Sequence, residues 1–236
     1  MLCFAIATDT SAQDWSDREY GIGLIGFPIP SDQPPGSSAN GITLAFYSSP
    51  SKESPQAAEL RSDSLKLMNE GETVSLYARV LEYEYEDVGF PILEFTPDSS
   101  WIRVSLNCWD MENRSTAWLS ASSPGITLLF WTELLGQDRS FFFLRTEWIQ
   151  FYSKPDTTEE VKIQLAQLYS KPHYHFLRKK IQGEWMQVEL ETPSTGCISD
   201  EEFKEAFGVK PTKQTVWIKF LDNNGRPRIF YSTRGC

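Results

Sequence analysis

The chain repeats a set of aromatic motifs in the same order in its two halves. Phe46-Tyr-Ser-Ser-Pro50-Ser recurs as Phe151-Tyr-Ser-Lys-Pro155-Asp, and Trp101-Ile-Arg-Val104 recurs as Trp185-Met-Gln-Val188. A third pair, Ala117-Trp-Leu119 and Val216-Trp-Ile218, closes each set. The matched points are offset by 105, 84 and 99 residues, so the loops differ in length while the order is kept. This pattern predicts tandem copies of a small domain rather than a solenoid of fixed period, with a chance match as the alternative.

Most segments between these motifs have the composition of short strands. They are rich in β-branched and aromatic residues and are bounded by Pro, Gly, Asn, Asp or Ser. The predicted strands are 42–47, 74–80, 91–95, 101–106, 116–119, 148–152, 174–178, 185–190, 215–221 and 228–231. The more continuously apolar segments 126–130 and 141–143 are expected to pack between the two halves.

Two local signals are stronger than the rest. Residues 222–225, Asp-Asn-Asn-Gly, predict a tight hairpin turn, because Asn-Gly readily adopts the positive φ values that such a turn requires. Ser199 followed by Glu202 forms a capping box, which predicts one helix that ends at Gly208. Phe203 and Phe207 would share one face of that helix.

The order of the repeated motifs resembles the bacterial Src-homology-3-like (SH3-like) family, whose members are small barrels of about five strands. Tyr47 to Pro50, Trp101 to Val104 and Trp118-Leu119 match the family's opening, middle and closing strands in the first copy. Tyr152 to Pro155, Trp185 to Val188 and Trp217-Ile218 match them in the second. The resemblance implies a mainly β chain of two tandem small SH3-like barrels, over 41–135 and 143–236, with one short helix in the second. Residues 13–40 would form an N-terminal segment.

The same resemblance implies a binding site. Family members often use aromatic grooves to hold peptides or peptidoglycan stems, so Tyr47, Tyr152, Trp101 and Trp185 are the candidate binding residues. The alternative is that these rings fill the core, because a unit of fewer than about 90 residues buries little surface and bulky aromatics fill it efficiently.

Charge narrows the range of partners. The chain carries 22 Lys and Arg against 32 Asp and Glu, for a net charge of −10. Such a chain is not expected to bind nucleic acid or an anionic membrane surface. No apolar run approaches the roughly 18 residues that a membrane-spanning helix needs, so we expect no membrane span. The partners that the resemblance implies, a peptide, a peptidoglycan component or a protein, are compatible with this charge.

The N-terminus and the cysteines bear on location. Residues 1–7 are apolar and Thr10-Ser-Ala12 are small, so residues 1–12 are either the remnant of a signal peptide or an ordinary frayed terminus. Without that segment, Cys108, Cys197 and Cys236 remain, and a Cys197–Cys236 disulfide would fasten the C-terminus. The alternative is three idle thiols. The prediction is a periplasmic or secreted bacterial protein.

No catalytic set stands out, so no catalytic residue, metal site or cofactor is predicted. His173 and His175 would lie on one face of a strand, but no Cys or carboxylate motif flanks them to complete a zinc site. The acidic segment 81–87 is expected to be a half-buried strand with a solvated face. The predicted function is a non-enzymatic extracytoplasmic binding or scaffold protein. A hydrolase of cell-wall or glycan material, or a purely structural assembly role, is the alternative.

Overall fold

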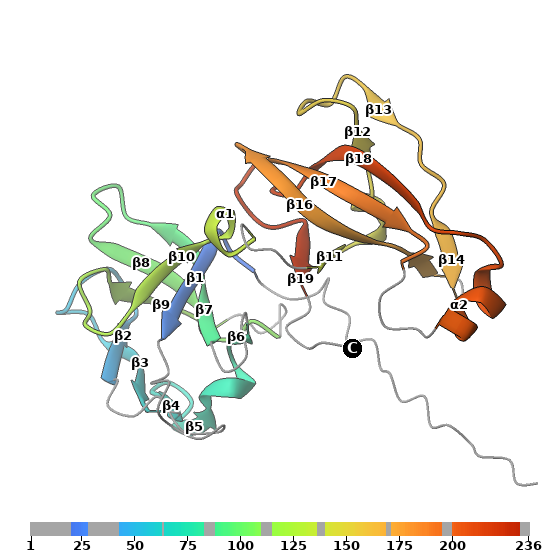
Figure 1. Cartoon of the computed structure of the whole chain (residues 1–236). Helices are drawn as coiled ribbons and strands as arrows, with labels where there is room; N and C mark the ends of the chain where they lie inside the picture. Colours follow the sequence, from blue (N-terminus) through green and yellow to red (C-terminus); the bar gives the residue numbers. More distant parts are fainter. Residues whose placement is uncertain are drawn as a thin grey trace, which may run out of the picture.

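Two large antiparallel β-sheets lie side by side in the chain (Figure 1). The computed structural model describes residues 20–27, 43–62, 64–82, 88–109, 115–135, 140–168, 171–194 and 200–231. We call residues 20–135 the first half and residues 140–231 the second half. The predicted mainly β fold is confirmed.

The first half forms a ten-stranded sheet in the order β10-β1-β7-β8-β9-β2-β3-β4-β5, with β6 paired to β7. A single 3₁₀ turn, Leu76–Ala78, follows β5, and the short helix α1 (Trp131–Leu134) follows β10. The strands are β1 (Gly23–Phe27), β2 (Thr43–Tyr47), β3 (Gln56–Arg61), β4 (Ser64–Leu67), β5 (Glu72–Ser75), β6 (Leu81–Glu82), β7 (Val88–Phe95), β8 (Trp101–Ser105), β9 (Thr116–Ser120) and β10 (Thr127–Phe130).

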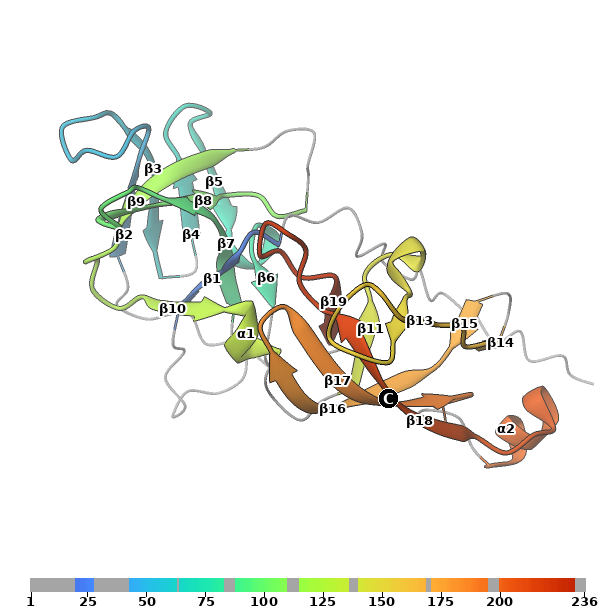
Figure 2. The same cartoon turned by 90° about the horizontal axis from the view of Figure 1, so that it is seen from above.

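The second half forms a seven-stranded sheet in the order β13-β12-β18-β17-β16-β11-β19, and β14 and β15 form a separate pair. A 3₁₀ turn, Thr146–Trp148, precedes β12, and the helix α2 (Asp200–Phe207) lies at the end of the molecule away from the first half (Figures 1 and 2). The strands are β11 (Ser140–Phe143), β12 (Phe151–Tyr152), β13 (Glu160–Val161), β14 (Ala166–Leu168), β15 (Lys171–His173), β16 (His175–Gln182), β17 (Trp185–Thr192), β18 (Thr212–Lys219) and β19 (Ile229–Tyr231).

The two sheets share one strand order. The run β10-β1-β7-β8-β9-β2 of the first half corresponds to β19-β11-β16-β17-β18-β12 of the second. These six strands also follow one another in the same order along the sequence of each half. In both halves the last strand pairs with the first, and three strands in a meander lie beside it. The order of the aromatic motifs along the sequence is thus accompanied by one order of strands in the two sheets.

Strand registers agree as closely as the strand order. In each half the repeated Trp that opens the middle strand faces the residue two positions after the Trp of the closing strand. The Tyr of the opening motif pairs with that closing Trp. The corresponding pairs are Tyr47–Trp118 and Tyr152–Trp217, Trp101–Ser120 and Trp185–Lys219, and Val104–Ala117 and Val188–Val216.

The irregularities also coincide. The register of β7 shifts between Ile92 and Glu94, and that of β16 shifts between Arg178 and Lys180. Both shifts lie opposite the same positions of the middle strand, counted from its Trp. The turn before each middle strand has a residue of positive φ two positions before the Trp, which is Ser99 in one half and Gly183 in the other.

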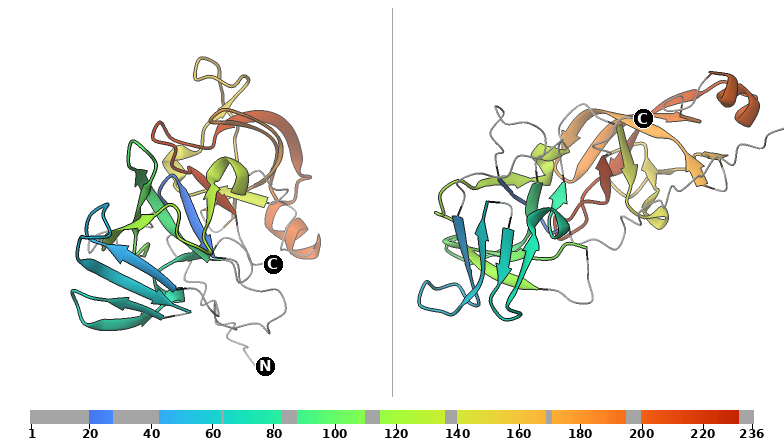
Figure 3. Two further views of the ribbon diagram at one scale, coloured as in Figure 1. Left: turned by 90° about the vertical axis from the view of Figure 1, so that its left-hand side faces the viewer. Right: turned by 90° about the horizontal axis from the view of Figure 1, so that it is seen from below.

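The first sheet wraps around its own core. Buried side chains from β1, β2, β3, β4, β7, β8 and β9 form one cluster, so the sheet must curve to enclose it. Figure 3 shows this curvature, with the blue to teal strands β2 to β5 crossing the green strands β7 to β9. Strand β3 pairs with β2 as β13 pairs with β12, and β4 and β5 extend the first sheet further.

A second core joins the two halves. It combines the buried side chains of the second sheet with Tyr20, Leu24 and Trp131 of the first half. Strand β1 is buried on both faces, since Leu24 belongs to this shared core and Ile25 to the core of the first sheet. Helix α1 lies between the two sheets (Figures 1 and 2), where Trp131 is 1% exposed.

The helix and the tight turn of the two strongest local predictions are confirmed. Helix α2 ends at Gly208, whose φ is +62° and whose N–H donates to the carbonyl of Lys204 at 3.0 Å. The Phe203 and Phe207 rings are 5.1 Å apart on one face of α2, whereas Ser199 of the capping box lies outside the described residues. The tight turn at 222–225 is present and closes with a 3.1 Å bond from the N–H of Gly225 to the carbonyl of Asp222. The predicted hairpin is limited to one bridge between Leu221 and Pro227, because β18 and β19 pair with other strands.

Other predictions need correction. Segment 74–80 is a strand only as far as Ser75 and then turns, and 148–152 is a strand only at Phe151 and Tyr152. The first sheet extends beyond the expected boundary at residue 41, because β1 lies inside it. Along the described strands neither large sheet closes into a barrel, since β5 and β10 lie at opposite edges of the first sheet and β13 and β19 at opposite edges of the second.

Candidate functional site

The first pair of predicted binding residues forms an exposed aromatic contact. Tyr47 ends β2 and Trp101 begins β8, and their ring centroids are 5.6 Å apart at an interplanar angle of 89°. Both side chains are half-buried. An edge-to-face contact of this kind fixes the orientation of the indole without covering both of its faces.

Trp101 lines an open pocket of about 520 Å³ where three turns meet. The loop between β2 and β3 contributes Lys52, and the turn before β8 contributes Ser99 and Ser100. The end of β9 and the residues after it contribute Ser120, Ala121 and Ser122. The pocket therefore presents an indole, one ammonium group and four hydroxyl groups.

The turn that carries Trp101 is rigidly built. Asp98 accepts hydrogen bonds from the hydroxyl groups of Thr96 and Ser100 at 2.6 and 2.9 Å, and these bonds lower the pKa of Asp98 to about 2. The N–H of Thr96 donates to the carbonyl of Trp101 at 3.0 Å and closes the turn. The Trp101 side chain thus starts from a fixed backbone position.

Lys52 is the charged group of this pocket. Its side chain is exposed, and it makes no hydrogen bond or ion pair with any other residue that the structure describes. Ser120 and Ser122 are joined by a 3.0 Å bond between their hydroxyl oxygens, which leaves acceptor capacity on both. The pocket can therefore donate to an anion and also accept from a neutral donor.

The second pair of predicted binding residues is buried. Tyr152 and Trp185 have ring centroids 5.1 Å apart and the same interplanar angle of 89°, so the geometry of the first pair is repeated. However, Tyr152 is 6% exposed and Trp185 is 8% exposed, and both pack with Trp217 in a small cluster of their own. Lys180 lies over the Trp217 ring at 4.9 Å. The rings of Tyr152, Trp185 and Trp217 are therefore part of the packed interior of the second half.

Several positions that form the pocket in the first half carry large or charged residues in the second. Glu184 occupies the place of Ser100 directly before the repeated Trp, and Lys219 occupies the place of Ser120 opposite it. Lys219 Nζ and Glu184 Oε1 form an ion pair at 3.1 Å. Phe220 takes the place of Ala121 and is fully buried.

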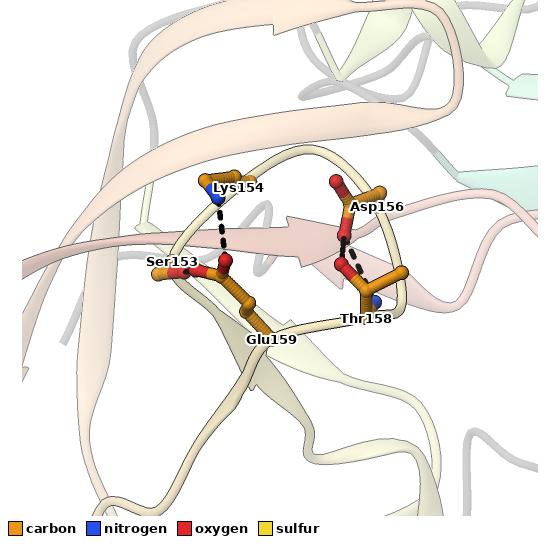
Figure 4. Close-up of polar contacts among 5 residues, drawn as sticks. All are labelled: Ser153, Lys154, Asp156, Thr158 and Glu159. Atoms are coloured by element: carbon orange, nitrogen blue, oxygen red, sulfur yellow. Dashed lines mark hydrogen bonds and ion pairs between the residues drawn. The ribbon is translucent and has the colours of Figure 1, made fainter.

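The loop after the repeated Tyr also differs between the halves. In the second half Lys154 forms an ion pair with Glu159, and the Ser153 hydroxyl donates to the same carboxylate at 2.6 Å (Figure 4). This bonding raises the pKa of Lys154 and lowers that of Glu159. Asp156 accepts from Thr158 across the same loop. Lys154 thus has a carboxylate partner that Lys52 lacks among the described residues.

The two histidines converge on one serine. The Ser194 hydroxyl lies 2.8 Å from Nδ1 of His175, and the Ser194 N–H donates to Nδ1 of His173 at 3.2 Å. Burial and the nearby His175 lower the pKa of His173. A serine nucleophile needs a hydroxyl that substrate can reach, and Ser194 is only 8% exposed. We interpret these contacts as structural, since they fasten the end of β17 to β15 and β16.

The remaining predicted features meet the limits of the described chain. Cys197, Cys236, residues 1–12 and segment 83–87 lie outside the described residues, while Cys108 is a fully buried thiol. Over the ranges given above, no group of three or more His, Cys, Asp or Glu side chains is placed to hold a metal ion. None of the described helices is long and apolar enough to cross a membrane.

The sequence analysis missed Lys52 and the serines of the pocket. The signal was present, because aligning the two copies at their Trp residues sets Ser100 and Ser120 against Glu184 and Lys219. Small residues at positions where a duplicate carries an ion pair indicate a hollow in that copy. No protein-family model, curated protein or solved structure matches the chain.

Proposed function

We propose that this chain is a non-enzymatic binding or scaffold protein that acts outside the cytoplasm. Its partner is a peptide, a cell-wall component or another protein. The Trp101 pocket of the first half holds the partner, and the second half supports the first.

One observation carries this proposal: the same Tyr–Trp pair opens onto a pocket in the first half and is buried in the second. If the rings served only to fill a core, both pairs would be expected to be covered. Instead Tyr47 and Trp101 stay half-exposed beside a pocket of about 520 Å³, a size in the range of small-ligand sites. Aromatic side chains with adaptable hydroxyl groups around them are a frequent composition for binding surfaces.

The SH3-like assignment and the location belong to the same proposal. The recurrence of one strand order in the two halves, with the last strand paired to the first in each, supports tandem SH3-like units. The extracytoplasmic location rests on the apolar N-terminal stretch and the proposed Cys197–Cys236 bridge.

Nuclear magnetic resonance can test the binding site directly. The ¹⁵N-labelled protein would be titrated with soluble peptidoglycan fragments and with a library of short peptides. We expect a binding ligand to shift the indole N–H of Trp101 and the amides of Ser99 and Ser120. Trp101→Ala should abolish binding, while Phe130→Ala, an exposed aromatic outside the pocket, should not. Equal binding by both variants would disprove the assignment.

The two tyrosines provide a matched pair of variants. Tyr47→Ala should weaken ligand binding and cost about 1 kcal/mol of stability, because this ring is half-exposed. Tyr152→Ala should leave ligand affinity unchanged and cost about 3–5 kcal/mol, because it removes a buried ring. Affinity would be measured by the same titration and stability by urea unfolding. A large stability loss in Tyr47→Ala with unchanged affinity would place Tyr47 in the core.

A further inference from the structure

We propose that the Trp101 pocket binds the carboxylate of an acidic peptide segment, with Lys52 providing the positive charge. This inference rests on the proposed function, since it assumes that the pocket is a binding site. It adds the chemical class of the ligand.

The corresponding positions of the second half are filled by an ion pair that the pocket lacks. There, Lys219 pairs with Glu184 at the place of Ser120 and Ser100. The first half keeps only hydroxyl groups at these two positions, so the acid and the base that fill the space in the second half are both missing. None of the described lining residues is acidic, but the Ser100 hydroxyl already donates to Asp98 behind it. Lys52 and the other three hydroxyl groups are the groups left to meet a carboxylate.

The second half contains an example of a carboxylate held by a serine and a lysine. In the loop of the second half, a serine hydroxyl and a lysine ammonium hold one glutamate carboxylate, through Ser153, Lys154 and Glu159 (Figure 4). Lys154 aligns with Ser49 of the first half. The corresponding loop there brings Lys52, three residues after Ser49, to the pocket. A hydroxyl and an ammonium group also meet at the pocket, where no described residue places a carboxylate against Lys52. A peptide glutamate would contact both groups in the way that Glu159 does in the second half.

Charge favours an anionic ligand. Among the described residues that line the pocket, Lys52 is the only charged side chain, and it has no partner within the same residues. In the loop of the second half, the ammonium group of Lys154 is already paired with Glu159. The ammonium group of Lys52 is therefore available to an anionic ligand at the pocket, whereas that of Lys154 is not.

The indole limits the shape of the ligand. Tyr47 packs edge-on against Trp101, so one part of the indole surface remains available beside the ammonium group. An apolar side chain next to the acidic residue can pack on this surface. The expected ligand is thus a glutamate or aspartate flanked by an apolar residue.

A pair of peptides that differ in one group tests the inference. Acetyl-Leu-Glu-Leu-amide and acetyl-Leu-Gln-Leu-amide have the same shape, and only the first carries a carboxylate. We expect the Glu peptide to bind about three- to tenfold more tightly at low salt, and the difference to shrink as salt is raised. Lys52→Met should remove the preference. Lys66→Met, at an exposed lysine of β4 outside the pocket, should retain it.

Each other outcome has a defined meaning. Equal binding of the two peptides, with shifts at Trp101, would overturn the carboxylate inference and leave the binding function standing. Absence of shifts at the pocket with any peptide or peptidoglycan fragment would overturn both. Glucuronate or inorganic phosphate that binds with dependence on Lys52, while the Glu peptide does not, would rule out an acidic peptide. A change of oligomeric state in Lys52→Met would identify a second copy of the chain as the occupant and would also overturn the peptide assignment.

Discussion

Gly21 and Gly183 adopt nearly the same backbone conformation in very different surroundings. Their φ angles are +59° and +60°, in the left-handed region that favours glycine. A Cβ on Gly183 would have no neighbour within 4 Å, whereas a Cβ on Gly21 would lie 2.1 Å from the carbonyl oxygen of Ile92. Gly21 also accepts a hydrogen bond from the indole of Trp131 at 3.1 Å. Comparing the two positions therefore separates the free-energy cost of a positive φ from the free-energy cost of a steric clash.

Replacing each of these glycines by alanine should give two distinct stability losses. Gly183→Ala should cost about 1 kcal/mol, because only the positive φ is unfavourable. Gly21→Ala should cost about 3 kcal/mol, because the backbone around Ile92 must also shift. Urea unfolding of the two variants measures both numbers. Similar losses would show that the contact with Ile92 relaxes freely.

The different burial of Tyr47 and Tyr152 could not be predicted from the sequence. The motifs around Tyr47 and Tyr152 are nearly identical, so the sequence predicts the same role for both. The structure separates them because the neighbours differ, with serines around one Trp and the Glu184–Lys219 ion pair beside the other. A ring is buried or exposed by what packs on it from distant parts of the chain, and a local motif does not contain that information.

At the scale of elements, strand periodicity explains which parts of the fold were predictable. Strands β8, β9 and β17 were predicted because they are rich in β-branched and aromatic residues between turn signals. Strand β1, Gly-Leu-Ile-Gly-Phe, was missed because it is buried on both faces and contains two glycines, so it shows no polar alternation. Strands β3 and β4 were missed because alanine, serine and charged residues dominate them. Their place in the sheet depends on pairing, of β3 with β2 and of β4 with β3.

The polar junction at the end of β17 should make stability depend on pH. Burial and the nearby His175 lower the pKa of His173 in the folded chain below its ordinary value of 6.5. The unfolded chain therefore binds more protons at mildly acidic pH, and the free energy of unfolding should fall as the pH drops through 6.5 toward the lower folded pKa. The His173 ring also lies 5.1 Å from that of Phe207, so α2 should loosen together with this junction.

The variant that tests this is His173→Asn, which retains an acceptor for the Ser194 N–H and does not titrate. Its free energy of unfolding should vary less between pH 5 and pH 7 than that of the wild type, measured by urea unfolding at several pH values. His173→Ala removes the acceptor as well and should be less stable at both pH values. An unchanged pH slope in His173→Asn would assign the dependence to another group.

At the scale of the whole molecule, the two halves are unequal parts of one structure. The sheet of the first half extends further, through β4 and β5, and this half has the open pocket. The second half closed the equivalent positions and contributes most of the side chains of the shared core. Strand β1 belongs to both cores, so the first half cannot lose contact with the second without exposing Leu24. This arrangement agrees with the proposal that the second half supports the binding site of the first.

Trp131 is the residue through which this coupling can be measured. Its ring packs against Tyr20 at 6.1 Å and against Phe230 of the second half at 5.8 Å, and it is 1% exposed. In the wild type, the indole signals of Trp101 and Trp185 should disappear at the same urea concentration, because the shared core makes unfolding cooperative. Trp131→Ala should cost about 3–5 kcal/mol and separate these two transitions, since each half retains a core of its own.

Phe130→Ala is the matched control, because Phe130 directly precedes Trp131 and is 38% exposed. It should cost less than about 1 kcal/mol and leave the two signals coincident. Two separate transitions already present in the wild type would mean that the halves fold independently and that the shared core is only a contact surface. In that case, a ligand bound at Trp101 would raise the unfolding midpoint of the first half alone, whereas in the coupled molecule it raises both.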